Sequence, residues 1–531
     1  MTAKIFVADD VSESGLGPLR SAGFIVEKRT GLSPSELREA LSDCEGLIVR
    51  SETKVTSELL DAAGRLRVIG RAGVGVDNID VSAATIRGIV VMNAPDGNTI
   101  TTAEHTIALL ISLARSIPQA SSSLKAGRWD RKKFIGVELQ GKTLGIVGLG
   151  RIGRVVAARA RAMGMQIVAY DPFIAPEHAR DLEIELASLD EVYARADFLT
   201  VHTPLTAETR SLIDRDAFGK MKKGAYIINC ARGGLVDEQA LYEAITEGTI
   251  AGAALDVFTQ EPPPAEDKLL QLDQVIVTPH LGASTKEAQE GVAFTVAEQM
   301  RDFLLTGVLR GAVNVPAIGV KEFNLVQPYV ALAESLGRFQ AQLVDRPVSE
   351  VRIEYAGEIV DLDAAPVTRA FLAGLLRDVS ARVNVVNAFL IAEERGIKVT
   401  TTYIRSGGEM APAIRTEIST GQSTQSLAGT LFGYGGERRE GRITEIDGFY
   451  LEAMPHGHMV VTRSQDVPGV IGSIGTILGQ GGVNISRFHL GRRERGGEAM
   501  AVIEVDVPLS KETLHALRSL EHVISAQPIE L

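Results

Sequence analysis

Cysteine is nearly absent from this chain of 531 residues: Cys44 and Cys230 are the only two, and they lie far apart in the sequence. Disulfide frameworks and zinc sites need several cysteines at short, regular spacings, so we expect neither, and no bound metal is predicted. The chain also lacks a run of about 18 apolar residues, which is the length that a membrane-spanning helix requires. A membrane span is therefore not expected.

Positive charge is in deficit as well. The chain has 55 lysines and arginines against 67 aspartates and glutamates, and its formal net charge is -12. A nucleic-acid-binding protein would need a concentrated basic face, so no nucleic-acid partner is predicted. The N-terminal residues run directly into a strand pattern without the apolar stretch of a signal peptide, and we expect a cytoplasmic protein.

The composition that remains is typical of a soluble globular protein, with 45% hydrophobic and 23% charged residues. The length predicts about three or four domains. From Lys4 to about Ala94, short apolar segments such as Gly46–Val49 and Val90–Met92 alternate with amphipathic helices. This alternation predicts a parallel α/β unit, and the unit contains no phosphate-binding loop.

The phosphate-binding signature comes in a second α/β unit. Gly148, Gly150 and Gly153 form a G-x-G-x-x-G turn after a buried strand, a helix is predicted over 154–163, and a further strand ends at Asp171. In this context the glycines allow a tight turn, close approach of a pyrophosphate and close packing of helix on strand, while the helix N-terminus favours the phosphates. Asp171 would bind the adenosine ribose diol and repel a 2′-phosphate, which favours NAD over NADP.

The chain organisation follows from these two units. A long helix over 102–116 opens the second unit, and a helix over 286–305 crosses back to the first. We therefore predict two Rossmann-like or flavodoxin-like α/β lobes, with a split substrate domain (1–97 and 285–317) around a dinucleotide-binding domain (98–284). An α+β domain (318–456) follows, and residues 457–531 show the strand and helix order βαββαβ of a ferredoxin-like domain. The cofactor and substrate are expected between the two lobes.

Three polar side chains of the second unit suggest the chemistry. Arg232, Glu261 and His280 all lie in glycine- or proline-rich segments just after predicted strands. Removing a hydride from a 2-hydroxy acid requires a base for the hydroxyl proton and a cation for the carboxylate. His280 suits the base, Glu261 would orient its ring, and the planar fork of Arg232 suits the carboxylate. Taken singly, each could be a surface ion pair, a solvated carboxylate or a turn residue; their common placement favours the catalytic interpretation.

Several motifs together resemble a known family. Gly73-Val-Gly-Val-Asp-Asn78, the glycine turn, Asn229-Cys-Ala-Arg-Gly-Gly234 and Thr278-Pro-His-Leu-Gly-Ala-Ser284 are similar to those of the D-isomer-specific 2-hydroxyacid dehydrogenases, over residues 4–316. The final domain resembles an ACT domain, and with the intervening domain it makes the whole chain similar to the long-form D-3-phosphoglycerate dehydrogenase branch. That branch oxidises 3-phospho-D-glycerate to 3-phosphooxypyruvate with NAD, as the first step of L-serine biosynthesis.

The resemblance implies roles for individual residues. Arg232 would hold the substrate carboxylate, with Glu261 and His280 as the acid/base pair. The residues expected to bind NAD are Gly148, Gly150, Arg151, Ile152, Gly153, Asp171, Thr203, Pro204, Cys230, Ala231, Arg232, Asp256, His280, Leu281, Gly282 and Ala283. The residues expected to bind 3-phosphoglycerate are Arg50, Arg71, Val74, Gly75, Asn98, Arg131 and Lys132. The basic cluster Arg131–Lys133 would reach the phosphate from a neighbouring subunit of a homodimer or homotetramer; alternatively, it is only a solvated run of charge.

For the ACT-like domain, the resemblance implies L-serine as an effector, with Asp466 and Asn484 as its ligands. Asp466 leads into a helix N-terminus, which favours a carboxylate, and Asn484 offers both a donor and an acceptor. Ser464 stands where the family often has a histidine or an aromatic residue. The alternative is a dimerisation module that binds nothing.

Other functions on the same fold also fit parts of the sequence. A glyoxylate or hydroxypyruvate reductase would share the two lobes but usually lacks the two C-terminal domains. A non-enzymatic NADH-sensing or amino-acid-sensing protein could dispense with Arg232, Glu261 and His280, and here all three are present. The sequence therefore favours the enzyme.

Overall fold

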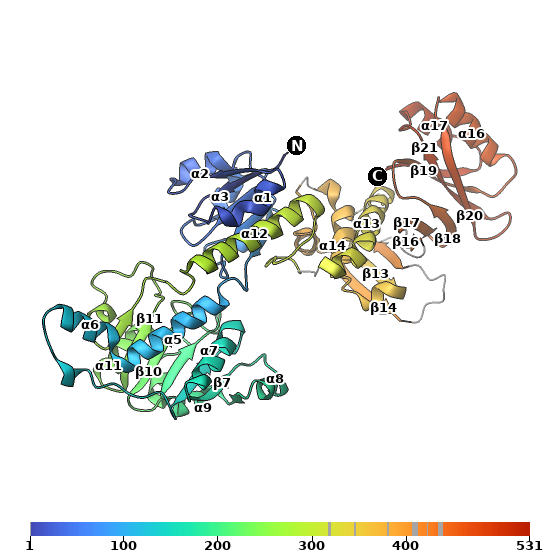
Figure 1. Cartoon of the computed structure of the whole chain (residues 1–531). Coiled ribbons are helices and arrows are strands. Elements are labelled where there is room, and N and C mark those ends of the chain that lie inside the picture. Colours follow the sequence, from blue (N-terminus) through green and yellow to red (C-terminus); the bar gives the residue numbers. More distant parts are fainter. Residues whose placement is uncertain are drawn as a thin grey trace.

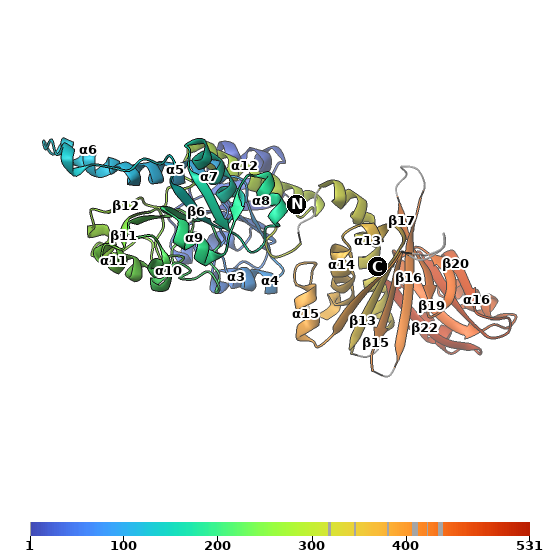
Figure 2. The ribbon, with the colours of Figure 1, turned by 90° about the horizontal axis from the view of Figure 1, so that it is seen from below.

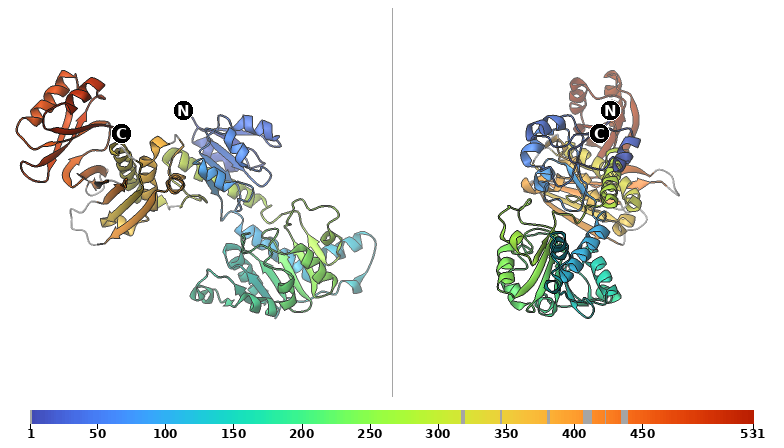
Figure 3. Two further views of the ribbon diagram at one scale, coloured as in Figure 1. Left: turned by 180° about the vertical axis from the view of Figure 1, so that it is seen from behind. Right: turned by 60° about the vertical axis from the view of Figure 1, so that its left-hand side comes forward.

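Four β-sheets organise the chain in the computed structural model, which describes residues 2–316, 320–344, 347–379, 382–405, 413–421, 423–433 and 439–531. Figure 1 shows two α/β lobes on one side, joined by helix α12, and two sheet-rich units on the other. Seen from behind in Figure 3, the C-terminal unit lies farthest from the second lobe. Among the described residues, no helix combines the length and the apolar character needed to cross a membrane.

The first lobe contains a five-stranded parallel sheet in the order β2-β1-β3-β4-β5. The sequence pattern does not predict β2, because this half-polar edge segment is short and becomes a strand only by pairing with β1. The elements are β1 (Lys4–Val7), α1 (Gly17–Ser21), β2 (Ile25–Lys28), α2 (Pro34–Leu41), β3 (Gly46–Val49), α3 (Ser57–Ala62), β4 (Val68–Arg71), α4 (Val81–Ile86) and β5 (Val90–Asn93).

The second lobe contains a seven-stranded parallel sheet in the order β12-β11-β10-β9-β6-β7-β8. The chain changes direction across the sheet between β6 and β9, and in such sheets ligands bind beyond the carboxyl ends of the strands at this switch point. The elements are α5 (Thr99–Arg115), α6 (Ile117–Lys125), the short helix η2 (Arg131–Lys133), β6 (Thr143–Val147), α7 (Arg151–Ala162), β7 (Gln166–Tyr170), α8 (Pro176–Asp181), β8 (Glu185–Leu186), α9 (Leu189–Arg195), β9 (Phe198–Val201), α10 (Arg215–Lys220), β10 (Ala225–Asn229), α11 (Glu238–Thr246), β11 (Ile250–Leu255) and β12 (Val275–Val277).

Helix α12 (Lys286–Thr306) returns the chain to the first lobe. Its buried face, including Val296 and Met300, belongs to the same hydrophobic core as strands β1, β3, β4 and β5. The helix lies so close to the sheet that a Cβ on Gly70 would be 2.3 Å from Val296. Burial of this apolar face stabilises the docking of α12 on the first lobe.

The two remaining sheets form the C-terminal units. The third sheet is mixed, in the order β14-β13-β15-β16-β17-β18, and the fourth is antiparallel, in the order β20-β21-β19-β22. The elements are α13 (Val320–Leu343), β13 (Glu350–Ala356), α14 (Ala365–Leu375), α15 (Ala388–Glu394), β14 (Lys398–Ile404), β15 (Ile414–Ser419), β16 (Thr424–Phe432), β17 (Glu440–Ile446), β18 (Phe449–Ala453), β19 (His458–Gln465), α16 (Val470–Gln480), β20 (Ile485–Arg492), β21 (Glu498–Val505), α17 (Lys511–Arg518) and β22 (Val523–Glu530).

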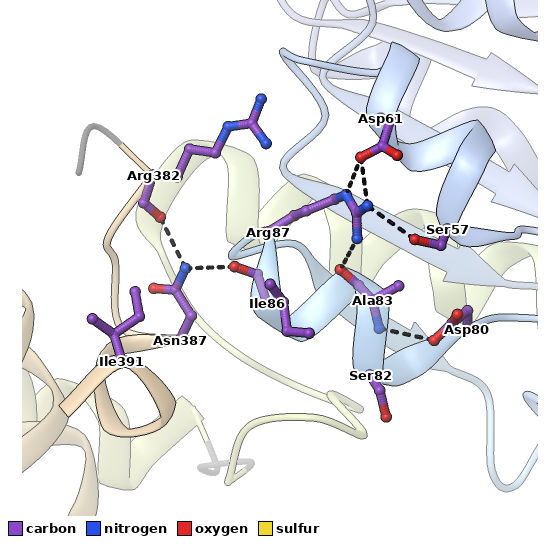
Figure 4. Close-up of a pocket in the computed structure, with 10 residues that line it drawn as sticks. All are labelled: Ser57, Asp61, Asp80, Ser82, Ala83, Ile86, Arg87, Arg382, Asn387 and Ile391. Carbon is purple, nitrogen blue, oxygen red and sulfur yellow. Dashed lines mark hydrogen bonds and ion pairs between the residues drawn. The ribbon is translucent and has the colours of Figure 1, made fainter. Parts of the chain in front are cut away.

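The third unit is docked on the first lobe by the segment just before α15. Figure 4 shows Asn387 between the Arg382 carbonyl and the carbonyl of Ile86 at the end of α4; its Nδ2 donates to the Ile86 oxygen over 3.1 Å. Asn384 donates to the carbonyl of Gly88 over 2.9 Å. Val386 is 3% exposed and belongs to the core of the first lobe. A cavity of about 550 Å³ lies beside this junction, between α3, α4 and α15.

The fold class predicted from the sequence is confirmed: two parallel α/β lobes, an α+β unit and a βαββαβ unit occur in this order. Two helices begin three residues earlier than the sequence predicts. Helix α7 begins at Arg151 because the chain becomes helical directly after Gly150, and α5 begins at Thr99, with Asn98 as its N-cap. The domain boundaries themselves stay predictions, and the one at 317/318 lies outside the described residues.

Candidate active site

The glycine turn joins β6 to α7. Gly148 has a φ of 96°, which glycine adopts without steric penalty. A Cβ on Gly153 would lie 2.2 Å from the Gly148 carbonyl oxygen, so the first turn of α7 packs directly on the strand end. A Cβ on Gly150 would have no atom within 4 Å. The turn is therefore tight on its inner side and open where a pyrophosphate would approach.

Asp171 follows β7 and holds this turn in place. Its carboxylate accepts hydrogen bonds from the Leu149 amide over 2.8 Å and from the Phe173 amide over 2.9 Å. Each carboxylate oxygen can accept a second bond, so the side chain can still bind a ribose diol. Asp171 thus ties the end of β7 to the phosphate-binding turn.

Other residues predicted to bind NAD gather around the same strand ends. Thr203 and Pro204 follow β9, and the buried Oγ1 of Thr203 has no hydrogen-bond partner among the described residues. Cys230 and Ala231 follow β10, and burial raises the pKa of the Cys230 thiol to about 12. The neutral thiol, the orphaned hydroxyl and the open glycine turn form a surface that fits a dinucleotide.

His280 and Glu261 are in direct contact. The Nδ1 of His280 lies 2.7 Å from Glu261 Oε2, while Glu261 Oε1 accepts a hydrogen bond from the Phe258 amide over 3.1 Å. Burial alone would raise the pKa of Glu261, but the hydrogen bonds from His280 and Phe258 outweigh it and lower the pKa below its ordinary value. An ionised Glu261 fixes the proton on His280 Nδ1 and leaves Nε2 as the acceptor.

Asp256 holds the turn that carries His280. Its carboxylate accepts hydrogen bonds from the amides of Leu281 (2.7 Å) and Gly282 (2.8 Å) and from the Thr278 hydroxyl (2.6 Å). Ala283, which is also expected to bind NAD, follows Gly282 in the same turn. Asp256 is fully buried, and its carboxylate oxygens face this turn. Asp256 therefore stabilises the turn, in addition to any contact that it makes with NAD.

Arg232 reaches across from the second lobe to the first. Its Nε donates to Asp77 Oδ2 over 3.0 Å, and its Nη1 donates to the Ala231 carbonyl. A Cβ on Gly75 would lie only 2.0 Å from Arg232 Nη2. Glycine at position 75 is therefore what allows the guanidinium to lie against the first lobe.

Arg50 and Arg71 approach from the first lobe. Burial, and then the neighbouring charges of Arg232 and Arg50, lower the pKa of Arg71 to about 10. The buried Nε of Arg71 has no hydrogen-bond partner among the described residues. Three guanidinium groups thus lie near one another, with Asp77 as a counterion, which is a suitable environment for an anion.

Val74 lies beside this cluster, between Gly73 and Gly75, and Asn98 lies on the segment that joins β5 to α5. The Val74 carbonyl accepts a hydrogen bond from Asn93, which fixes the Gly73–Gly75 loop. Asn98 is the N-cap of α5, and its buried Oδ1 has no partner among the described residues.

Arg131 and Lys132 are not brought to this cluster within one chain. They lie in η2, beyond helix α6, with exposed side chains. Figure 2 shows α6 projecting away from the body of both lobes. Any contact of these residues with a substrate phosphate would have to be made in another subunit.

Asp466 and Asn484 are also kept apart. Asp466 accepts hydrogen bonds from the Gly496 amide and Arg492, at one end of the fourth sheet. Asn484 donates to Asp506 at the other end. The register of β19 and β20 on β21 places the two residues at opposite ends of β21, so one domain alone cannot bring both to the same ligand.

Asp77, Asp96 and His105 have no role that the sequence motifs predict. Asp96 pairs with Arg151 of the glycine turn over 2.7 Å, and His105 lies 3.1 Å from Asp256. The helical spacing of Thr102, His105 and Thr106 is only a weak signal for His105, because α5 also carries polar residues such as Thr101, Glu104 and Ser112.

Comparison with known families matches three segments of the chain. Residues 107–282 match the NAD binding domain of D-isomer specific 2-hydroxyacid dehydrogenases. Residues 325–447 match the D-3-phosphoglycerate dehydrogenase intervening domain, and residues 458–522 match the ACT domain.

Curated relatives cover nearly the whole chain. D-3-phosphoglycerate dehydrogenase of Archaeoglobus fulgidus is 43% identical over 99% of this chain and 100% of its own length. That of Bacillus subtilis is 43% identical over 99% of both chains.

Solved structures match a little over half of the chain. The cofactor (NAD+) bound 3-phosphoglycerate dehydrogenase of Entamoeba histolytica is 30% identical, with a TM-score of 0.51, over 60% of this chain and 100% of that one. D-Lactate dehydrogenase of Aquifex aeolicus, complexed with NAD and lactic acid, is 28% identical, with a TM-score of 0.52, over 59% of this chain and 100% of that one.

Proposed function

The chain belongs to the D-3-phosphoglycerate dehydrogenases of the D-isomer-specific 2-hydroxyacid dehydrogenase family. On this premise we propose that it oxidises 3-phospho-D-glycerate to 3-phosphooxypyruvate with NAD as the hydride acceptor, and that Arg232, Glu261 and His280 bind the substrate and move its proton. The observation that carries the assignment is the 2.7 Å contact between His280 Nδ1 and Glu261 Oε2. It leaves His280 Nε2 free to take the hydroxyl proton. The cytoplasmic location stays a prediction.

His280 and Glu261 handle the proton. Nε2 of His280 takes the proton from the 2-hydroxyl as the carbonyl forms, and the carboxylate of Glu261 stabilises the imidazolium that results. When bound, NAD supplies the acceptor for the hydride that leaves C2. The proton and the hydride thus leave the same carbon–oxygen unit to two different acceptors.

Arg232 and the first lobe orient the substrate. The guanidinium of Arg232 binds the carboxylate, and Arg50 and Arg71 add positive charge for the carboxylate and phosphate groups. The amides of Val74 and Gly75 and the side chain of Asn98 provide further polar contacts. Residues of the NAD set around Gly150, Asp171 and Thr203 hold the cofactor on the second lobe.

A variant of the base tests this assignment. In His280→Asn we expect kcat to fall by about 10²- to 10⁴-fold, the usual contribution of general acid–base catalysis, with NADH affinity nearly unchanged. NADH formation is measured with 3-phosphoglycerate and with a panel of 2-hydroxy acids that lack the phosphate. A variant that keeps most of its turnover, or a wild-type enzyme indifferent to the phosphate, would contradict the proposal.

We also propose a homodimer or homotetramer formed through the projecting arm of residues 117–135, which contains α6 and η2. Trp129 is 79% exposed and Ile135 is 84% exposed on this arm, next to Arg131 and Lys132. Covering such side chains with a second copy would bury apolar area and could bring the basic cluster to the partner's substrate phosphate. Light scattering after gel filtration should give a multiple of the 56.8 kDa chain mass, and Trp129→Glu should shift it toward the monomer.

L-serine is the proposed effector of the ACT domain. Since Asp466 and Asn484 lie at opposite ends of one sheet, the site would form between two copies, with Asp466 of one opposite Asn484 of its partner. Calorimetric titration of the full chain with L-serine should show heat of binding, and an activity assay should show inhibition by L-serine. A chain ending at Pro455 should show neither. No heat and no inhibition in the full chain would leave the domain as a structural clamp.

A further inference from the structure

Helix α5 is bonded to the turn that carries His280. The hydroxyl of Thr102 donates to the Gly282 carbonyl over 2.9 Å, and the hydroxyls of Thr101 and Thr285 lie 3.2 Å apart. One turn farther along the helix, His105 Nε2 lies 3.1 Å from Asp256 Oδ1. Because α5 begins in the segment that leaves the first lobe, these contacts connect the interlobe linker to the catalytic turn.

The catalytic turn needs such support. His280 has a φ of 54°, a left-handed conformation that is unfavourable for a residue with a side chain. The backbone of Asp256 accepts the His280 amide over 2.9 Å, and its carboxylate accepts the amides of the next two residues. The conformation of His280 therefore depends on the exact position of the Asp256 side chain.

The Asp256 carboxylate is in turn held by His105. Asp256 is 0% exposed, and a buried carboxylate is stable only when hydrogen-bond donors or a cation compensate its lost hydration. His105 Nε2 is the basic ring nitrogen within hydrogen-bond distance of it, and it also lies 3.2 Å from the Thr278 hydroxyl. The ring therefore contacts both residues that anchor the turn.

We infer that His105 is a positioning residue for catalysis: by donating to Asp256 from α5, it keeps the His280 turn aligned with Glu261. The inference rests on the proposed function, in which His280 is the base. His105 itself contacts Asp256 and Thr278 rather than the expected reaction centre.

Two amide variants that differ only in reach test the inference. Glutamine can place its Nε2 near the position of the histidine Nε2, whereas asparagine is too short to reach Asp256. In His105→Asn we expect kcat to fall by about 10- to 100-fold, the effect of a misplaced catalytic group, while KM for 3-phosphoglycerate changes far less. The isotope effect with substrate deuterated at C2 should rise, because the chemical step becomes limiting. His105→Gln should restore most of the turnover.

The neighbouring Glu104→Gln is the control, because Glu104 is exposed and pairs with Arg159 of α7 instead. It should leave kcat and KM unchanged. Equal turnover of His105→Asn and wild type, or equal loss in the asparagine and glutamine variants, would overturn the inference.

Amide hydrogen exchange of residues 278–285 separates the inference from the proposed function, since it needs no substrate. Faster exchange at Leu281 and Gly282 in His105→Asn, but not in His105→Gln, supports the positioning role even if the enzyme acts on another hydroxy acid. Unchanged exchange in both variants refutes it.

Discussion

At the residue scale, Asp171 has two roles, and a single substitution of its side chain affects both. Its carboxylate holds the Leu149 and Phe173 amides and faces the expected ribose site. In Asp171→Ala we expect NAD affinity to fall by at least about tenfold, because hydrogen bonds to a charged group contribute roughly 1.5–3 kcal/mol. The preference for NAD over NADP should shrink, since the repulsion of a 2′-phosphate is lost. Fluorescence titrations with NADH and NADPH measure the affinity and the preference. An unchanged preference would mean that another residue binds the ribose.

His202, which follows β9, gives the fold a pH dependence. Burial lowers its pKa from 6.5 to about 4. The unfolded chain therefore binds a proton that the folded chain excludes between these values, so stability is lost as pH falls from about 6.5 to 4. At about 1.36 kcal/mol per pKa unit, the full difference amounts to about 3 kcal/mol.

Denaturant unfolding of His202→Asn at several pH values checks this expectation. The variant should lose less stability than wild type between neutral and acidic pH. His456→Asn is the control, because that ring is exposed and stays in water in both states. Parallel stability curves for wild type and His202→Asn would contradict the prediction.

At the scale of elements, two glycines of the β6–α7 turn differ in the space around them: Gly153 is packed against the chain, and Gly150 faces open space. Gly153→Ala places a Cβ against the Gly148 carbonyl, and the overpacking should destabilise the fold by about 1–3 kcal/mol. Gly150→Ala meets open space, so the free energy of unfolding should stay within about 0.5 kcal/mol of wild type. NADH binding should nevertheless weaken strongly, because the new methyl group occupies the side from which a pyrophosphate approaches.

Denaturation curves and NADH titrations on both variants distinguish these effects. Stability loss should be confined to Gly153→Ala, while Gly150→Ala shows a binding defect in a stable protein. Normal NADH affinity in Gly150→Ala would mean that the cofactor does not cross this turn.

At the scale of the whole molecule, the segment before α15 couples the C-terminal units to the first lobe. Val386 is buried in the first lobe's core. Asn387 donates to the carbonyl of Ile86 at the end of α4, and Asn384 donates to the carbonyl of Gly88 just after it. Val386→Asp would bury an unpaired carboxylate in that core, so we expect the two units to separate. Small-angle scattering should show a larger radius of gyration. Phe389→Ala is the control, because Phe389 is 38% exposed and stacks on Arg369 within its own unit. Superimposable scattering curves for Val386→Asp and wild type would refute the coupling.

The sequence by itself determined the order of the four units, the glycine turn and the candidate residues Asp171, Arg232, Glu261 and His280. These follow from local signals: strand and helix periodicity, turn glycines, and polar residues directly after strands of a parallel sheet, whose carboxyl ends share one edge. Periodicity does not predict edge strand β2, because this strand forms by pairing with β1. It also misses the starts of α5 and α7, because no side-chain cap marks them in the sequence.

Only the tertiary structure decided which distant residues meet. Asp77 and Arg232 are 155 positions apart, His105 and Asp256 are 151 apart, and Ile86 and Asn387 are 301 apart. Such contacts depend on how separate elements pack, and local periodicity carries no information about the side chain that will lie opposite. The same holds for Asp466 and Asn484, which are only 18 positions apart in the sequence. Because β19 and β20 both run antiparallel to β21, the end of β19 and the start of β20 lie at opposite ends of the sheet.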